Sequence, residues 1–329
     1  MSKKVSIIGA GAWGTTLATL FAENGNQVTL WVYEKDLAEE MSERRENKRF
    51  LPGFQLPESI TVTNDLNQIK DTEIVVFVVP TQFLRSTAKQ AAKVIGAKAI
   101  IVCASKGIEE KTLKLPLDIL KDELKTNNLA VLSGPNLSKE IASGQPAATV
   151  VASDNEQTAR IVQQALLQER LRVYTNDDPI GVELGGALKN IIAIAAGVSD
   201  GLELGDNAKS AIMIRGIAEI SRLGVALGAK AETFAGLSGM GDLITTCSSK
   251  LSRNHRVGEQ LAKGQSLADI QKDLKAVAEG VFTVKAALDL GKKLKVALPI
   301  TQEVHAILYQ NKKPFQAISD LMSRSAKQE

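Results

Sequence analysis

Residues 5–14 read Val5-Ser6-Ile7-Ile8-Gly9-Ala10-Gly11-Ala12-Trp13-Gly14, a short apolar run that leads directly into a glycine-rich turn. The turn fits the pattern Gly-x-Gly-x-x-Gly, and the residues that follow have the apolar spacing of a helix. In such a strand–turn–helix, Gly9 permits the tight turn, Gly11 lets the backbone approach a pyrophosphate, and Gly14 lets the helix pack closely on the strand. The motif alone would also fit an ordinary glycine-rich turn, but its place after the first strand favours a dinucleotide site.

Further apolar runs in the first half predict the rest of this fold. They are rich in Val and Ile, nearly continuous, and separated by helical stretches such as Thr15–Asn24 and Gln82–Ile95. Strands buried on both faces of a parallel sheet have this composition. Strand–helix repetition then predicts an α/β, doubly wound (Rossmann) parallel sheet. The predicted strands are Val5–Ile8, Val28–Val32, Ile74–Val79, Ala99–Ala104, Leu129–Leu132, Ala148–Ala152 and Leu171–Tyr174.

After about Asp178 the strand-like runs end and long helical segments follow. We therefore predict two domains, a dinucleotide-binding domain over residues 1–177 and an all-α substrate and catalytic domain over residues 178–329. The sequence does not give the oligomeric state, although a helical domain with apolar stripes often supports a homodimer. The predicted helices are Pro179–Val198, Asn207–Leu227, Arg253–Ala262, Val281–Leu294 and Thr301–Tyr309.

Composition favours an ordinary globular protein. The net charge of +3 over 329 residues is small, and no basic stripe interleaved with aromatic residues occurs, so we expect no nucleic-acid partner. Cys103 and Cys247 form no CxxC pair, and we expect two buried thiols and no metal site. The first apolar run stops at Gly9 and no stretch is long enough to span a membrane. We expect a soluble, cytoplasmic protein without membrane insertion.

The end of the second predicted strand, around Tyr33 and Glu34, is where an adenosine ribose should bind. Glu34 lies 20 residues beyond Gly14 (34 − 14 = 20), where a carboxylate can accept from a ribose 2′-OH and repel a 2′-phosphate. This leaves NAD and NADP open and favours NAD slightly. Five nearby basic residues could instead attract a 2′-phosphate, although such a run is usually a solvated helix face: Lys35, Arg44, Arg45, Lys48 and Arg49.

Polar residues also stand where simple packing would not require them. Ser105-Lys106-Gly107 follows one apolar strand and Ser133-Gly134-Pro135-Asn136 follows the next, both at the carboxyl edge where ligands of open α/β sheets bind. A helix is predicted to begin at Asn136. Lys189-Asn190 lies inside an almost wholly apolar helix rich in small residues. The segments Gly239-Met240-Gly241-Asp242-Leu243 and Ser252-Arg253-Asn254 flank a loop rich in Ser and Thr.

Lys189 carries the strongest signal among these residues. A lysine in an apolar helix usually extends to the surface, but flanking Gly and Ala give its stem a poor surface, which favours general acid–base chemistry. Arg253 offers a planar fork for a phosphate, with Asn254 as a neutral donor, yet both also fit an ordinary helix start capped by Ser252. His255, expected to be exposed, and His305 have no convincing carboxylate partner, and we assign neither a role.

Eight segments carry a further signal, in chain order GAGAWGTTLA, FVVPTQFL, SKGIE, LSGPNLSKE, ELGGALKNIIAIAAGVSDGL, LSGMGDLITTC, SRNHRVGE and AVAEGVFT. With them, from about Val5 to about Ile307, the chain resembles the NAD(P)-dependent glycerol-3-phosphate dehydrogenase family. The most specific motifs are GALKNIIAIAAG and GDLITTC…SRN. The resemblance implies hydride transfer between NAD(P)H and dihydroxyacetone phosphate, giving sn-glycerol 3-phosphate and supplying glycerophospholipid synthesis.

The resemblance also implies residue roles, with Lys189 as the proton donor and acceptor. Ala12, Asn136 and Ser138 depart from residues common in the family, so that Ala12 can contribute only its backbone. The implied substrate residues are Lys106, Gly134, Asn136, Lys189, Asp242, Ser252, Arg253 and Asn254. The implied cofactor contacts are Ala12, Trp13, Tyr33, Lys106, Ser138, Arg253, Val277 and Glu279.

Two alternatives remain for comparison. A related β-hydroxyacid dehydrogenase shares the two-domain plan and the helix lysine, but the segment SGPNLSKE and the Arg253-Asn254 pair disfavour it. A non-catalytic NAD(H) sensor would need neither a lysine inside an apolar helix nor a second cluster of anion donors.

Overall fold

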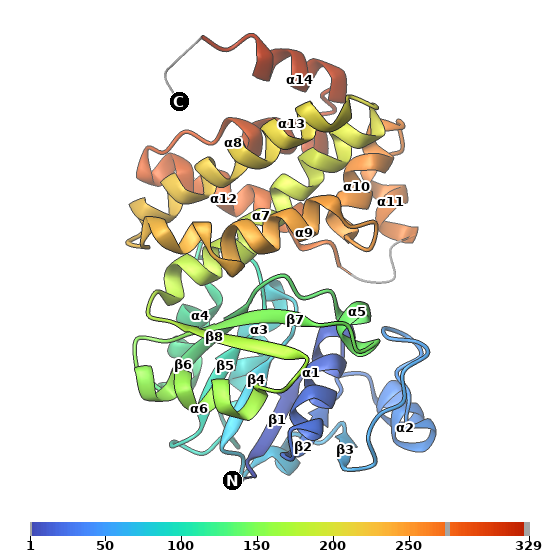
Figure 1. Ribbon diagram of the computed structural model, residues 1–329, viewed down its shortest axis with the longest axis vertical. Coiled ribbons are helices and arrows are strands. Elements are labelled where there is room, and N and C mark those ends of the chain that lie inside the picture. The colour runs from blue at the N-terminus through green and yellow to red at the C-terminus, as the bar shows by residue number, and fades with distance from the viewer. Residues whose placement is uncertain (1, 274–276, 326–329) are drawn as a thin grey trace. The chain divides into compact units, whose positions relative to one another are not determined.

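The computed structural model describes residues 2–273 and 277–325, and the chain divides into two compact units (Figure 1). The first unit comprises Met1–Lys106 and Lys114–Glu183, and the second comprises Gly107–Leu113 and Leu184–Glu329. The predicted boundary was 177/178. In the structure the division lies inside a continuous helix, α7 (Pro179–Gly201), and the short segment 107–113 groups with the second unit.

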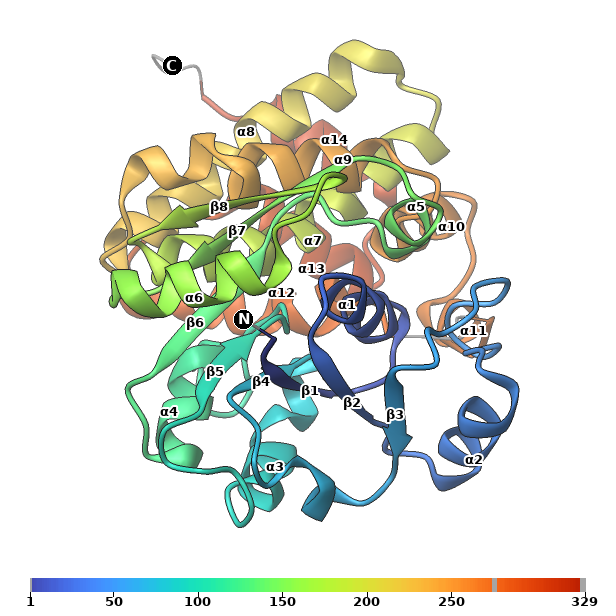
Figure 2. The same cartoon turned by 60° about the horizontal axis from the view of Figure 1, so that its bottom comes forward.

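Eight strands form one sheet in the first unit, in the order β3-β2-β1-β4-β5-β6-β7-β8 (Figure 2). Ile7 of the first strand packs in one hydrophobic cluster and Ile8 in another, because successive side chains of a strand point to opposite faces. The doubly wound sheet is confirmed. The strands are β1 (Lys4–Ile8), β2 (Gln27–Trp31), β3 (Ile60–Thr63), β4 (Ile74–Phe77), β5 (Ile100–Cys103), β6 (Leu129–Ser133), β7 (Ala147–Ala152) and β8 (Leu171–Asn176).

The sheet differs from the prediction in two places. β7 pairs with β6 antiparallel, not parallel, because β7 begins at the edge where β6 ends, and the Thr149 hydroxyl donates to the Ser133 carbonyl there (2.8 Å). β3 was missed because it is a four-residue edge strand of alternating Ile/Val and Thr with only its end residues buried, so it lacks the continuous apolar run of the central strands.

Helices cover both faces of the sheet (Figure 2). α1 packs against β2 and β1, while α3 and α4 pack against each other and α4 lies on β5 and β6. The helices of this unit are α1 (Ala12–Glu23), α2 (Lys35–Arg44), the 3₁₀ turn η1 (Leu66–Ile69), α3 (Thr81–Ala91), α4 (Pro116–Leu124), α5 (Ser138–Ala142) and α6 (Glu156–Leu166).

The described residues of the second unit are helical, as predicted. Its central helix α7 crosses α10 at very close range: a Cβ at Gly197 would lie 1.9 Å from the carbonyl oxygen of His255. The helices after α7 are α8 (Gly205–Ala226), η2 (Ala231–Ala235), η3 (Leu237–Gly241), α9 (Asp242–Ser248), α10 (Arg253–Ala262), α11 (Leu267–Asp273), α12 (Glu279–Leu294), α13 (Pro299–Tyr309) and α14 (Pro314–Met322).

Among the described residues, α7 alone is long and apolar enough to cross a membrane, and 94% of that stretch is buried inside the protein. Both cysteines are free and buried, as predicted. Burial raises the pKa of the Cys247 thiol to about 12, which makes it a poor nucleophile.

The expectation that His255 is exposed was wrong. It is 4% exposed, and its Nε2 lies 2.8 Å from Oδ2 of Asp200, which also pairs with Lys209 (2.6 Å). The burial of His255 could not be predicted from local sequence, because Asp200 lies on α7, far from His255 along the chain. Only the close crossing of α7 and α10 brings the two residues together. Desolvation opposes the charge on Asp200, but hydrogen bonds from Lys209 and His255 outweigh it and lower the pKa of Asp200.

Candidate active site

The glycine-rich turn has the shape of a phosphate cradle. Gly9 has φ of 114°, and a Cβ there would lie 2.6 Å from the Val78 carbonyl oxygen. A Cβ at Gly14 would lie 1.9 Å from the Gly9 carbonyl oxygen, so α1 can approach β1 only with glycine there. Nothing lies within 4 Å of the Cβ position at Gly11, and no side chain caps α1. The start of α1, including Ala12 and Trp13, therefore fits a pyrophosphate.

Tyr33 and Glu34 follow β2 at the same edge of the sheet. Tyr33 is 72% exposed, and its ring packs edge-on against Trp31. Asn64 donates to the carbonyl oxygens of Val32 (2.8 Å) and Tyr33 (2.7 Å), which fixes the backbone here. Glu34 is half-buried at the N-cap position of α2, and its side chain makes no capping bond.

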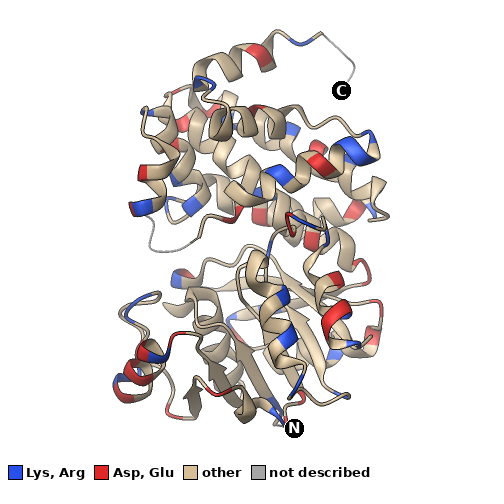
Figure 3. Cartoon of the chain, turned by 180° about the vertical axis from the view of Figure 1, so that it is seen from behind, with Lys and Arg blue, Asp and Glu red and all other residues tan. Residues whose placement is uncertain are grey.

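Four of the five basic residues near Glu34 have partners of their own, and the fifth, Lys48, is exposed. Figure 3 shows acidic and basic residues mixed on α2, where Lys35 pairs with Glu39 and Arg44 with Glu40. Arg49 pairs with Asp36 at 2.7 Å, which lowers the pKa of Asp36. Arg45 donates to the Ile60 carbonyl oxygen (2.8 Å). These contacts are those of a solvated helix face and leave Glu34 as the half-buried charge nearest the end of β2.

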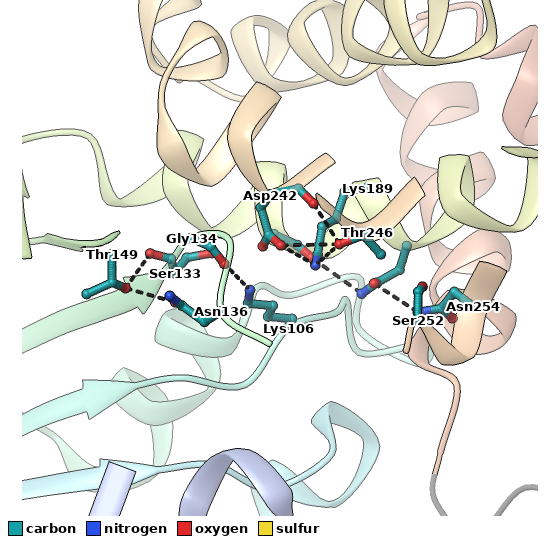
Figure 4. Close-up of polar contacts among 12 residues, drawn as sticks. Lys106, Ser133, Gly134, Asn136, Thr149, Lys189, Asp242, Thr246, Ser252 and Asn254 are labelled. Atoms are coloured by element: carbon teal, nitrogen blue, oxygen red, sulfur yellow. Dashed lines mark hydrogen bonds and ion pairs between the residues drawn. The ribbon is translucent and has the colours of Figure 1, made fainter. Parts of the chain in front are cut away.

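A second group of polar atoms lies at the carboxyl ends of β5 and β6 (Figure 4). Lys106 donates to the carbonyl oxygen of Gly134 (3.3 Å), whose φ is 142°. The amide of Asn136 donates to the Ala148 carbonyl (3.1 Å) and accepts from Thr149 (3.0 Å). The antiparallel strand β7 therefore holds the loop after β6 in place, and a predicted substrate segment is pre-formed in the first unit.

Ser138 is also in this loop region. It begins the short helix α5, two residues later than the helix start predicted at Asn136, and its carbonyl oxygen accepts a long bond from Thr16 of α1 (3.4 Å). Ser138 is thereby tied to the helix that begins at the glycine-rich turn.

Lys189 of α7 is 7% exposed and forms an ion pair with Asp242, which is 2% exposed. Its Nζ also donates to Oγ1 of Thr246 (2.6 Å), and that hydroxyl donates to the backbone carbonyl of Asp242 (2.6 Å) (Figure 4). Asp242 and Thr246 are four residues apart on α9 and so share one face. The turn η3, which leads into α9, can approach α7 because residue 185 is a glycine. A Cβ there would lie only 2.5 Å from the Ser238 carbonyl oxygen. The buried lysine expected from the sequence thus has two partners.

The start of α10 is built around a second network. Ser252 caps the helix by accepting from the His255 N–H (3.2 Å), which places Arg253, exposed, in the first turn. Asn254 is buried and engaged twice: it donates to Asn190 (2.9 Å) and accepts from the Gly280 N–H (3.0 Å).

Val277 and Glu279, both half-buried, are the remaining residues proposed to contact the cofactor. Glu279 begins α12 beside Gly280. The network of Asn190, Asn254 and Gly280 therefore connects α7, α10 and α12 within the second unit.

Sequence reasoning missed three polar residues of these networks. Thr246 contacts Lys189, and its spacing of four from Asp242 was the available signal. Asn190 was noted only as the neighbour of Lys189, and its link to Asn254 is tertiary. Asn47 is fully buried beneath the glycine-rich turn, and no local pattern pointed to it.

A doubly wound sheet with a phosphate cradle, followed by a helical unit with a buried lysine, defines the class of NAD(P)-dependent dehydrogenases with a Rossmann unit and a helical unit. Within this class the chain belongs to the NAD-dependent glycerol-3-phosphate dehydrogenase family. The model of that family's N-terminus matches residues 4–159, and the model of its C-terminus matches residues 178–319.

Individual relatives agree. The chain is 48% identical to glycerol-3-phosphate dehydrogenase [NAD(P)+] of Citrifermentans bemidjiense, over 100% of this chain and 99% of the relative. The crystal structure of glycerol-3-phosphate dehydrogenase from Coxiella burnetii superposes with a TM-score of 0.94 at 38% identity, covering 98% and 99% of the two chains. A ketopantoate reductase from Ralstonia eutropha shares the fold alone, at 17% identity and a TM-score of 0.61, over 96% of this chain and 99% of the other.

Proposed function

We propose that the chain is an NAD(P)-dependent glycerol-3-phosphate dehydrogenase, which interconverts dihydroxyacetone phosphate and sn-glycerol 3-phosphate. The observation that carries the proposal is the buried Lys189–Asp242–Thr246 cluster on α7 and α9, in a chain whose other unit has a dinucleotide cradle. A sensor that only binds a dinucleotide has no need of a buried lysine, because burying a charge costs free energy even where a carboxylate partner offsets part of that cost.

Lys189 acts as the proton donor to the substrate oxygen. As the carbonyl carbon is reduced, negative charge develops on its oxygen, and an ammonium group can neutralise that charge by giving up a proton. Asp242 favours the ammonium form of Lys189, the form that carries the proton, and Thr246 helps to orient it. In the reverse direction the same lysine accepts the proton from the alcohol.

Arg253 recognises the substrate phosphate. Arg253 is an exposed residue in the first turn of α10, where the helix dipole also favours an anion, while desolvation of its guanidinium lowers its pKa. Asn254 holds the start of α10 in place, because its side-chain amide forms hydrogen bonds with Asn190 and with the Gly280 N–H. Lys106, Gly134 and Asn136 of the first unit are the other substrate residues that the family resemblance implies.

The glycine-rich turn and the start of α1 would hold the pyrophosphate, and Tyr33 and Glu34 the adenosine end. NAD(P)H supplies the hydride when bound. Because Glu34 is the half-buried charge after β2 while four of the five neighbouring cations bond to carboxylates or backbone carbonyls, we propose that NADH is preferred over NADPH.

The test is the loss of nicotinamide absorbance with dihydroxyacetone phosphate and each of NADH and NADPH. We expect turnover with dihydroxyacetone phosphate and little with β-hydroxyacid precursors such as a β-keto acid. Cofactor binding without turnover of any carbonyl substrate would favour the sensor, and preference for the β-keto acid would favour the alternative dehydrogenase.

We propose further that the enzyme is a homodimer joined through α8. Ala211, Ile214, Ala218 and Val225 form one stripe at helical spacing, and Ile214 (47%) and Val225 (49%) are exposed. In an antiparallel pair with its two-fold axis at Ala218, Ala211 of one copy meets Val225 of the other. The stripe is thus self-complementary, as a two-fold interface requires.

We propose that the protein is located in the cytoplasm, where Cys103 and Cys247 stay reduced. There the product would supply the glycerol backbone of glycerophospholipids.

A further inference from the structure

Asn47 lies beneath the glycine-rich turn and has no exposed surface. Its Nδ2 donates to the carbonyl oxygen of Ala10 (2.7 Å) and to Oγ1 of Thr15 (2.8 Å), and its Oδ1 accepts from the Phe50 N–H (3.1 Å). Ala10 lies between the first two glycines of the turn, and Thr15 is in the first helical turns of α1. One side chain therefore joins the turn, the helix that follows it and the segment after α2.

The segment that carries Asn47 is itself held at both ends. The Leu51 N–H donates to the Asn47 carbonyl (2.9 Å), and the Leu56 N–H donates to the Arg45 carbonyl (2.6 Å). Leu51 and Leu56 are both buried. Asn47 is thus presented to the turn from a packed loop and not from a mobile surface segment.

The bond to Ala10 sets the direction of the neighbouring donor. The peptide between Ala10 and Gly11 is planar and trans, so its carbonyl oxygen and its N–H point in opposite directions. With the Ala10 oxygen directed at Asn47, the Gly11 N–H points away from Asn47, and within the described part of the chain no group accepts from it. Glycine at position 11 would otherwise allow this peptide to rotate.

We infer that Asn47 is a positioning residue for the dinucleotide: by holding the Ala10 carbonyl inward, it keeps the Gly11 N–H aimed at the pyrophosphate. The inference rests on the proposed use of the glycine-rich turn. Asn47 does not touch the cofactor, and it acts by removing the freedom of the turn before binding, so its loss lowers cofactor affinity more than the rate of the chemical step.

The chain offers a matched control in Asn26, another buried asparagine of the same unit. Its Nδ2 donates to the carbonyls of Phe21 (2.9 Å) and Ala165 (3.0 Å), and its Oδ1 accepts from the Lys3 N–H (3.1 Å). Like Asn47, it donates twice and accepts once from a backbone N–H, although both of its acceptors are carbonyls. Asn26 precedes β2 at the amino edge of the sheet, opposite the turn.

The experiment compares Asn47→Asp with Asn26→Asp. Each change keeps the size and one acceptor, and replaces the donating NH₂ by an oxygen. That oxygen faces the Ala10 carbonyl in Asn47→Asp and the Phe21 and Ala165 carbonyls in Asn26→Asp. The dissociation constant for NADH, measured by fluorescence without substrate, should rise about tenfold in Asn47→Asp (about 1.4 kcal/mol) and less than twofold in Asn26→Asp. Melting temperatures should fall similarly in both, and kcat at saturating NADH should change less than about threefold in both.

Equal NADH affinity in Asn47→Asp and wild type would overturn the inference, as would an equal loss in both variants. If Asn47→Asp does not fold, Thr15→Val decides, since it removes one of the two acceptors of Asn47 and should weaken NADH binding by two- to threefold. No weakening there would also overturn it. Because NADH binding is measured without substrate, these outcomes are separate from a failure of wild type to reduce dihydroxyacetone phosphate.

Discussion

Lys189 is held by oxygen atoms from one face of α9, Oδ1 of Asp242 and Oγ1 of Thr246. We predict that Lys189→Met lowers kcat by about 10²-fold or more, the scale of general acid catalysis, because methionine has no proton to give to the substrate oxygen. NADH binding should persist, since the dinucleotide cradle is in the other unit. Steady-state kinetics and NADH titration measure the two effects.

The control is Lys312→Met, a lysine of the same unit that pairs with Asp320 (2.6 Å) and with Glu303, outside the proposed site. Its kcat should stay within about twofold of wild type. Near wild-type turnover in Lys189→Met would remove the lysine from the mechanism.

Arg253 is predicted to act on the phosphate, which is remote from the reacting carbon. Binding energy from such a remote group can serve to orient the carbonyl. Arg253→Ala should therefore lower kcat/KM for dihydroxyacetone phosphate by at least about 10²-fold, yet change little for unphosphorylated dihydroxyacetone. Comparable losses on the two substrates would instead indicate that Arg253 supports the fold of α10.

Glu34 decides the cofactor preference in our proposal. A 2′-phosphate would meet its carboxylate as a like charge, whereas a ribose 2′-OH can donate to it. We predict a modest preference for NADH in wild type and a narrowed or reversed preference in Glu34→Ser. The ratio of kcat/KM for NADH and NADPH measures this, and an unmoved ratio would make Glu34 an ordinary surface acid.

Two buried glutamate side chains each bond to the start of a neighbouring helix and so fix the position of that helix. Glu219 of α8 accepts from the backbone N–H groups of Ile300 (2.6 Å) and Thr301 (3.2 Å), so it caps the start of α13. Glu183 of α7 accepts from the Leu117 N–H (2.8 Å) at the start of α4. Both carboxylates replace the capping side chain that the helix itself lacks.

Glu183 should make stability depend on pH. Burial raises its pKa from 4.5 to about 8 in the folded protein, so between these values the folded state holds a proton that the unfolded state has released. Its contribution to stability is fully present below about pH 4.5 and is lost as pH rises to about 8. The slope from one group is at most about 1.4 kcal/mol per pH unit.

The variant Glu183→Gln cannot ionise and keeps an oxygen for the Leu117 N–H. Its free energy of unfolding, relative to wild type, should increase from pH 5 to pH 8 and then level off. Denaturant titrations at a series of pH values measure the difference. A difference that stays constant over this range would mean that Glu183 is already ionised when folded.

At the scale of the whole molecule, the proposed dimer depends on the stripe on α8. We predict that Ile214→Glu combined with Val225→Glu gives a monomer, because a two-fold interface places each added charge near its copy or in an apolar contact. Light scattering or sedimentation measures the mass. Met322→Glu, at the 82% exposed apolar residue of α14, is the matched control and should leave the dimer intact. A monomeric wild type would contradict the proposal outright.

Local patterns in the sequence were enough for the α/β plan, the helical second part and the glycine-rich turn. Continuous Val and Ile runs, glycines at fixed spacing and apolar helical periods are short-range features, and each is determined within about ten to twenty residues. Lys189 could also be singled out from local sequence, because the apolar residues that make it unusual belong to its own helix.

Tertiary structure alone decided which polar groups meet. Four contacts join residues that are distant along the chain. They are the antiparallel pairing of β7 with β6, the pairing of Lys189 with Asp242 and Thr246, the contact of buried His255 with Asp200, and the bonds of Asn47 under the glycine-rich turn. Such contacts arise where backbones approach closely, as at Gly185 and Gly197, and a sequence pattern records only the glycine, not the partner that it admits. The physical reason is that these partners are selected by how the helices and strands pack against one another, not by the local sequence of any one of them.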